Sequence, residues 1–488
     1  MINKIRSSFY GDSLQAKISK GIVWSFLGTF ISKGLMLLAF IMIARIISVE
    51  EYGQVGIIRN TITTFAAFSV MSFGITATKY LAIYKKNNII RAERILTFTR
   101  GFVVISSILI ASLIFIFSDY IALKMLDDLS LSFDVKLSSA TILFTALNGY
   151  QNGLLAGLER FREISFINIL NGILTFPILI TLAYYYKVDG IIIGLIIISF
   201  LTWIMSDYYV RQSLRKNSLK YRFDSFYKEF KIIKNFTLPS FLSGLSIAPA
   251  ILITNLILAH QENGYYQLGI FNAAYFFSVI TSTLNGVIGQ VVYPYAMQQF
   301  EKENKRFEYF NIIIPWVIGI ALNLPLILFP EIMAFFFGDK YNTADFKITI
   351  ILVALFSIII AHRQGISRNF AAANLMWWSV TGNIFWAIVL IICAIFLAEM
   401  GSIGLGISFF IAYLLNTIIF LPFYLKKKLI DKKLLISKYS LLIWIIIFMS
   451  IPIYFYIDSL VLKIFILINM IIILAYLFLL LWREFNGT

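Results

Sequence analysis

The sequence predicts an all-α polytopic membrane protein that crosses the bilayer about fourteen times. Of its 488 residues, 60% are apolar and only 14% carry a charge. A soluble domain is about half apolar and about a quarter charged, so this chain is solvated largely by lipid. Apolar stretches such as Ile191 to Ile198 do not alternate with polar residues. A membrane β-barrel requires that alternation over about ten residues, so the crossings are predicted to be helices.

A hydrocarbon core of about 30 Å requires about twenty apolar residues for each helical crossing. The predicted spans, in chain order, are 21–47, 54–82, 97–118, 137–158, 163–185, 190–210, 236–258, 266–295, 310–330, 346–370, 376–398, 402–424, 439–457 and 459–482. Residues 1–20 are basic but contain no apolar core or cleavage site of a signal peptide. We therefore expect the first span to act as the targeting signal.

Lysine and arginine are concentrated in the loops on one side of these spans, and short loops rich in them stay cytoplasmic. The basic residues on that side are Lys85, Lys86, Arg91 and Arg94, then Arg211, Arg215, Lys216, Lys220, Arg222, Lys228, Lys231 and Lys234, then Lys426, Lys427, Lys428, Lys432 and Lys433. Both termini are therefore expected in the cytoplasm. The formal charge of +16 reflects this topology and does not indicate a nucleic-acid partner.

The chain also repeats itself, which predicts two lobes of six helices. The strings Ser25–Leu27 and Tyr52–Ile57 recur about 213 residues later as Ser240–Leu242 and Tyr266–Ile270. Because six is an even number, the lobes are predicted to be parallel repeats, as in rocking transporters. The predicted domains are an N-lobe at 1–210, a basic cytoplasmic linker at 211–235, a C-lobe at 236–424 and a terminal helix pair at 425–488.

Several polar residues fall inside the predicted spans, where a charge is expensive and usually faces a cavity or a partner. Lys33 lies near the middle of the first span on the polar stripe Ser25, Gly28, Thr29 and Ser32. The candidate substrate-binding residues selected in this way are Lys33, Arg59, Asn60, Gln151, Asn152, Asn285, His362 and Arg363. Helix packing, snorkelling and structural ion pairs remain alternative explanations for them.

The position of His362 and Arg363 depends on the repeat. Hydropathy alone would end the tenth span near Ala361. A second repeated string, Gly190–Leu195 matched by Gly401–Gly406, gives an offset of about 211, which aligns these two residues with Gln151 and Asn152. We therefore expect His362 and Arg363 inside the helix.

The sequence lacks the motifs of several catalytic classes. It contains no GxxxxGK[ST], HExxH, CxxC or GxSxG string, and it has two histidines and one cysteine. We therefore expect no enzymatic activity, no catalytic residues, no cofactor and no metal. Transport by alternating access is the favoured function.

Three short motifs carry a resemblance to a known family. They are Ala44–Arg45 followed by Glu51–Tyr52–Gly53, then Gly157–Leu158–Glu159–Arg160–Phe161, and Phe337–Gly338–Asp339–Lys340–Tyr341. With them the chain resembles the Wzx-type polysaccharide (O-antigen) flippases of the multidrug/oligosaccharidyl-lipid/polysaccharide exporter superfamily. The resemblance covers essentially the full length.

The resemblance implies a bacterial inner-membrane flippase. Its substrate would be an undecaprenyl-pyrophosphate-linked oligosaccharide repeat unit, moved from the cytoplasmic to the periplasmic leaflet for lipopolysaccharide or related polysaccharide biosynthesis. The implied partners are the lipid-linked oligosaccharide, membrane lipids, a glycan polymerase and a chain-length regulator. Alternatives are a multidrug or cation antiporter or a peptidoglycan-precursor flippase of the same superfamily, or a membrane glycosyltransferase. The antiporter is disfavoured because no first-lobe span has a carboxylate near its middle.

Overall fold

The computed structural model of the chain describes residues 14–70, 72–224, 226–230, 232, 237–238, 241–242, 247–300, 305–373 and 375–486. Across these ranges the secondary structure is helical, with no β-strand. This confirms the predicted all-α class. The chain forms two compact units, Met1–His260 and Gln261–Thr488, which are described separately below.

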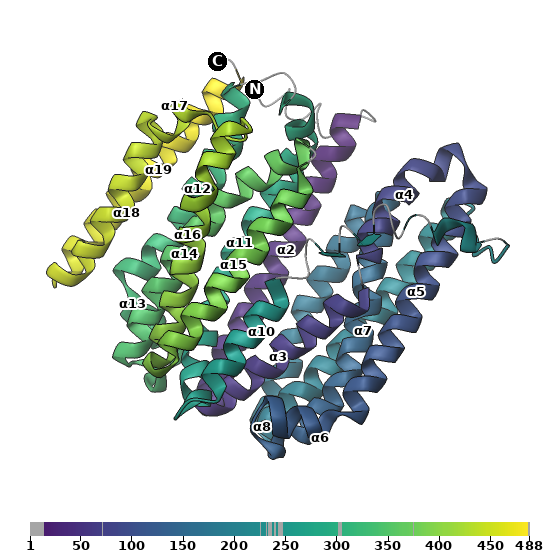
Figure 1. Cartoon of the computed structure of the whole chain (residues 1–488), viewed down its shortest axis with the longest axis horizontal. Coiled ribbons are helices and arrows are strands. Elements are labelled where there is room, and N and C mark those ends of the chain that lie inside the picture. Colours follow the sequence, from purple (N-terminus) through teal and green to yellow (C-terminus); the bar gives the residue numbers. More distant parts are fainter. Residues whose placement is uncertain are drawn as a thin grey trace. The chain divides into compact units, whose positions relative to one another are not determined.

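The first unit is built from long helices joined by short turns (Figure 1). Its main helices are α2 (Leu14–Ile46), α3 (Val49–Val70), α4 (Phe73–Asn87), α5 (Ile89–Ile116), α7 (Ser132–Gly157), α8 (Phe161–Lys216) and α10 (Ile247–Ala259). Its short helical segments are α6 (Ser118–Tyr120), η1 (Ile121–Met125), η2 (Leu129–Leu131) and η3 (Phe226–Phe230). Helix α8 packs against both α2 and α7.

The second unit follows the same pattern and ends in a helix pair, drawn in yellow in Figure 1. Its helices are α11 (Gly264–Phe300), α12 (Lys305–Leu328), α13 (Pro330–Phe337), α14 (Ala344–Ala372), α15 (Met376–Leu397), α16 (Gly401–Lys426), α17 (Lys432–Leu435), α18 (Lys438–Tyr456) and α19 (Leu460–Asn486), with single turns η5 (Asp339–Tyr341) and η6 (Ala398–Met400). Helix α14 packs against α11, α12 and α16, so it is central to the unit.

Helix α8 is an antiparallel hairpin. Lys187 takes φ 49°, which breaks the helix between its two limbs. The Asn171 amide donates a hydrogen bond to Thr202 Oγ1 at 2.7 Å, and a β-carbon on Gly190 would lie 2.0 Å from the Leu182 carbonyl oxygen. Glycine is therefore required at position 190. Each limb corresponds to one of the predicted spans 163–185 and 190–210.

The segment α15–η6–α16 reverses in the same way at Gly401, which has φ +61°. The Asn416 amide donates to the Gly382 carbonyl, and the rings of Trp378 and Phe423 lie 4.4 Å apart. These contacts pair residues from opposite ends of the segment, as an antiparallel hairpin requires. The equivalent reversals in the two units agree with the predicted repeat.

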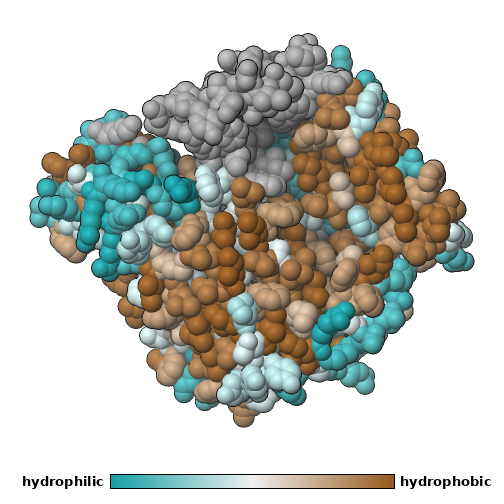
Figure 2. Space-filling view, turned by 180° about the vertical axis from the view of Figure 1, so that it is seen from behind, coloured by the Kyte–Doolittle hydropathy of each residue, from teal (hydrophilic) through white to brown (hydrophobic). Residues whose placement is uncertain are grey.

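Eight helical stretches of the described chain are long and apolar enough to cross a membrane, or nine if the bent pair α3 and α4 is one crossing. The hairpins at Lys187 and Gly401 each fall within one of these stretches, so the number of stretches understates the number of crossings. The number fourteen stays a prediction. On the face drawn in Figure 2, apolar side chains form broad continuous areas, and a soluble protein rarely exposes such areas. The chain is therefore a multi-pass membrane protein.

The boundary between the compact units lies farther along the chain than the predicted lobe boundary. The first unit continues to His260 because α10 packs against α3, where the Thr64 hydroxyl donates to the Ala248 carbonyl at 3.3 Å. Residues 247–260, which we expected in the C-lobe, therefore pack with the first unit. The terminal pair α18 and α19 packs on α12 of the second unit.

Candidate functional site

Two cationic side chains lie near each other in the first unit. Lys33 is on α2 and Arg59 is on α3; both are half-buried, and they are close enough to repel one another. The guanidinium carbon of Arg59 lies 4.1 Å from the centre of the Phe40 ring, a cation–π contact that fixes the arginine. Lys33 forms no ion pair with any residue that the structure describes. The unit thus concentrates positive charge between α2 and α3.

The polar stripe that carries Lys33 also packs against another helix. A β-carbon on Gly28 would lie 2.8 Å from Ser165 Cα, and one on Gly172 would lie 2.7 Å from Ser32 Cα. These residues bring α2 and α8 into close contact, as small residues do between membrane helices. This part of the stripe is therefore a packing face, and Lys33 lies at its end.

Asn60 is half-buried beside Arg59 on α3, one turn before Thr64. Thr64 lines a small pocket of roughly 100 Å³ between α3, the start of α10 and Phe241. The other residues that line this pocket are Ala67, Phe68, Ser72, Ala248 and Pro249. The pocket is polar at Thr64 and Ser72 and otherwise apolar.

Gln151 and Asn152 lie in the packed region between α7 and α8. The Gln151 amide is within 3.4 Å of Asp207 Oδ1, and Asp207 accepts a hydrogen bond from Arg211 Nε at 2.5 Å. Ser206 donates to Asn148 at 2.9 Å in the same region. Gln151 therefore contributes to helix packing. The Asn152 side-chain oxygen is buried and accepts no hydrogen bond from the described residues.

In the second unit α14 continues unbroken through His362 and Arg363 to Ala372, as the repeat predicted. The two side chains face different helices. His362 lies 4.7 Å from the Trp316 ring of α12, and the guanidinium carbon of Arg363 lies 5.7 Å from the Tyr413 ring of α16. Tyr424, also on α16, lies close enough to Arg363 to interact with its charge. Sequence reasoning missed both tyrosines, which the hydropathy pattern does not distinguish from lipid-facing aromatics.

Asn285 is fully buried on α11, and neither of its side-chain polar atoms has a hydrogen-bond partner among the described residues. Its amide nitrogen lies 3.7 Å from where a β-carbon on Gly319 of α12 would be. One turn away, Asn323 donates to Thr281 at 3.1 Å. Sequence reasoning missed Asn323 as a member of this buried polar group.

Arg368 is a further buried cation that sequence reasoning missed. Its side chain donates to the Asn311 side-chain oxygen at 2.6 Å and to the Asn311 carbonyl at 2.8 Å. Asn369 beside it donates to the Leu429 carbonyl at 2.7 Å. This network ties the end of α14 to the start of α12 and to the loop after α16. The only sequence signal was an arginine within two residues of the predicted span end.

The structure therefore brings together Lys33 and Arg59 in the first unit, with Asn60 next to Arg59 along α3. In the second unit it brings together His362 and Arg363 on one helix, with Asn285 on the helix packed against it. Gln151 contacts Asp207 on the neighbouring helix, and Asn152 follows it on α7 with a buried side-chain oxygen. Within the described residues, no group of three or more His, Cys, Asp or Glu side chains could hold a metal ion.

Comparison with solved structures defines the class of the fold. The lipid II flippase MurJ in an inward closed conformation matches with a TM-score of 0.68 over 96% of this chain and 99% of that chain, at 19% identity. An inward-facing multidrug resistance MATE family transporter matches with a TM-score of 0.66 over 83% of this chain and 98% of that chain, at 16% identity. A transporter of the same superfamily from Pyrococcus furiosus matches with a TM-score of 0.65 over 86% of this chain and 97% of that chain, at 17% identity. The fold is that of the MOP superfamily of transporters.

Residues 18–300 match the family described as Polysaccharide biosynthesis protein, and the chain belongs to this family. A curated relative from Shigella flexneri, named "Putative O-antigen transporter", is 23% identical over 361 residues, which are 70% of this chain and 81% of the relative. The resemblance noted in the sequence is thus confirmed.

Proposed function

We propose that this protein moves an undecaprenyl-pyrophosphate-linked oligosaccharide repeat unit from the cytoplasmic to the periplasmic leaflet of a bacterial inner membrane by alternating access. Its family, its relative named as an O-antigen transporter and its fold, shared with a lipid II flippase, support this proposal. The transported molecule leaves the protein chemically unchanged.

The proximity of Lys33 and Arg59 carries the proposal. Two like charges at this depth in a membrane are unfavourable unless an anion offsets their repulsion. A pyrophosphate provides two phosphate groups, and arginine binds such groups through paired hydrogen bonds. Phe40 holds the Arg59 guanidinium in place before substrate arrives, which lowers the entropic cost of binding. We therefore assign the pyrophosphate to Lys33 and Arg59.

Arg363 is assigned to the glycan or to a second anionic group. Its two tyrosine neighbours, Tyr413 and Tyr424, present aromatic rings and hydroxyls beside a fixed positive charge. Sugars bind through hydroxyl hydrogen bonds and through stacking of their apolar faces on such rings. His362 packs on Trp316, so we assign it a supporting role within the helix bundle.

The two alternative transport functions differ in the sign and size of their substrate. A cationic drug would be repelled by Lys33 and Arg59, so the geometry disfavours a multidrug antiporter. A peptidoglycan precursor carries the same kind of pyrophosphate, so the same pair would bind it. Growth distinguishes the two flippases: loss of a peptidoglycan-precursor flippase stops cell-wall synthesis, whereas loss of a repeat-unit flippase removes surface glycan.

The test is to replace both charges in the cell. The variants Lys33→Gln and Arg59→Gln should each lower surface glycan at least about tenfold, because each removes a charge-assisted contact to the phosphate. Lipid-linked repeat units should accumulate on the cytoplasmic side of the membrane.

The matched control is Lys124→Gln, which removes an exposed cation from η1, on the side predicted to face the periplasm, and should leave surface glycan unchanged. Membrane levels of each variant are measured in parallel. Normal surface glycan in both Lys33→Gln and Arg59→Gln, at normal protein levels, would refute the assigned pyrophosphate site. Absence of the lipid-linked unit after gene deletion would instead indicate an earlier synthetic enzyme.

A further inference from the structure

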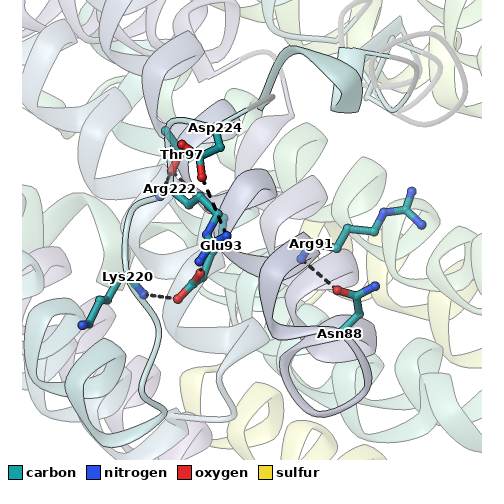
Figure 3. Close-up of polar contacts among 7 residues, drawn as sticks. All are labelled: Asn88, Arg91, Glu93, Thr97, Lys220, Arg222 and Asp224. Carbon is teal, nitrogen blue, oxygen red and sulfur yellow. Dashed lines mark hydrogen bonds and ion pairs between the residues drawn. The ribbon is translucent and has the colours of Figure 1, made fainter.

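The linker after α8 is held against α5 by buried polar contacts (Figure 3). Glu93 is 6% exposed; it accepts a hydrogen bond from the Lys220 backbone amide at 3.0 Å and from Arg222 Nε at 3.1 Å. The Arg222 backbone amide donates to Thr97 at 2.7 Å. Residues on α5 therefore accept the hydrogen bonds of the Lys220 and Arg222 backbone amides, which holds this part of the linker against the helix.

A second contact fixes the next part of the linker. Glu229 on η3 is 5% exposed and pairs with Arg91 Nε at 3.3 Å, and Arg91 also donates to the Tyr84 hydroxyl at 2.8 Å. The Phe230 ring lies 6.4 Å from Phe98 and 6.3 Å from Phe102. Lys220, Arg222, Glu229 and Phe230 are thus held at several points along α5.

These contacts set the depth of the linker. The predicted third span begins at residue 97, and Phe102 lies about 8 Å farther along the helix axis. A segment that contacts α5 from Glu93 to Phe102 therefore lies at the boundary between headgroups and hydrocarbon.

The outer side of the linker has a different composition. Phe223 is 74% exposed and Tyr227 is 65% exposed, and three cations are exposed as well: Arg215 and Lys216 in the last turn of α8, and Lys220 in the linker. None of these three cations forms an ion pair with a residue that the structure describes. Figure 3 shows the Lys220 side chain directed away from Glu93, which uses only the backbone amide. We call these five residues the linker face.

We propose that the linker face binds anionic lipid headgroups of the adjacent leaflet, which the topology prediction makes cytoplasmic. Aromatic side chains are favoured at the membrane interface, and cations close to the membrane are attracted to anionic lipids. The linker face combines both features at the depth where headgroups lie. This inference is independent of the substrate that the protein transports.

The test is tryptic cleavage of the full-length protein in lipid nanodiscs. One set of discs contains phosphatidylcholine alone, and the other also contains phosphatidylglycerol. Cleavage after Lys220 is measured relative to cleavage after Lys433, which lies in the short helix α17 and has no neighbouring exposed aromatic pair. We expect phosphatidylglycerol to slow the relative cleavage after Lys220. Equal relative rates in the two kinds of disc would overturn the proposal.

Two variants separate the components of the linker face. Arg215→Gln should weaken the protection in anionic discs about fivefold, because one interfacial cation is lost. Its control, Lys124→Gln, removes an exposed cation distant in sequence from both cleavage sites and should leave the relative cleavage after Lys220 unchanged. Phe223→Ser should reduce protection with all cations retained.

Neither the Arg215 nor the Phe223 side chain contributes to the Glu93 contacts, so folding should be preserved. Wild-type protection in the Arg215→Gln variant would overturn the electrostatic basis of the proposal. Protection that appears only in native membranes, and never in purified discs with anionic lipid, would assign the surface to a protein partner and overturn the lipid proposal.

Discussion

The carboxyl group of Asp134 is a titratable group in an unusual setting. It lies just before the predicted fourth span and is 3% exposed. Burial raises the pKa of Asp134 to about 7, and the neighbouring Asp189 carboxylate adds to the shift. An acid whose pKa is raised by folding binds its proton more tightly in the folded state. Folding stability therefore falls as the pH rises from about 4 to about 7.

This shift leads to a pH-dependent prediction. The melting temperature of the purified protein should be higher at pH 5 than at pH 8, and Asp134→Asn should reduce that difference because asparagine stays neutral. The exposed Asp458→Asn serves as the control and should retain the wild-type pH dependence. An unchanged pH dependence in Asp134→Asn would show that Asp134 is ionised across this range.

Arg368 gives a second prediction for a single residue. Arg368→Met should lower the free energy of unfolding by about 2 to 5 kcal/mol, because it removes two charge-assisted hydrogen bonds and leaves the buried Asn311 oxygens unpaired. Arg368→Lys should restore only part of the loss, since an ammonium group does not match the two acceptors as a guanidinium does. Thermal unfolding in detergent measures the stability of both variants. Equal stability of Arg368→Met and the wild type would contradict the role assigned to this network.

Close packing between α4 and α7 gives a prediction for one pair of helices. A β-carbon on Gly153 would lie 2.3 Å from the Gly74 carbonyl oxygen, and Thr78 donates to the Gly153 carbonyl at 2.6 Å. Gly153→Ala should therefore force the helices apart and destabilise the protein by about 1 to 3 kcal/mol. The matched control is Gly101→Ala on α5, where a β-carbon meets no atom within 4 Å. That change should be neutral or stabilising by up to about 1 kcal/mol. Equal melting temperatures for both variants would contradict the packing.

The sequence predicted the helices better than their contacts. Hydropathy identified membrane helices because each crossing requires a long apolar stretch, and the repeat correctly extended the tenth span past Ala361. The contacts between helices could not be predicted, because small and polar residues line cavities and also occur where helices pack together. Gly28 and Ser32 proved to pack on α8, and Gln151 to contact Asp207. The Glu93–Arg222 contact joins residues far apart in the sequence, and the charge pattern gave no sign of it.

At the scale of the whole molecule, the charge distribution predicts how the chain is threaded. Reporter fusions after Lys220 and after Lys433 should show activity typical of the cytoplasm, and a fusion after Asp128 should show activity typical of the outside. The reason is that short loops rich in lysine and arginine are retained inside. An external signal from the fusion after Lys220 would refute the predicted orientation of both units.

The hairpin of α8 has a consequence for how the protein is made. Only a few residues around Lys187 separate its two apolar limbs, and the Asn171–Thr202 hydrogen bond joins them within the region of the predicted spans. The Thr202 hydroxyl also donates to the Ile198 carbonyl within its own limb, but without Thr202 the Asn171 amide would lose this acceptor in hydrocarbon, at a cost of several kcal/mol. The first limb is therefore best accommodated once the second has left the ribosome, so that both enter the lipid as one unit. A ribosome paused before residue 190 would leave that limb without its partner at the insertion site.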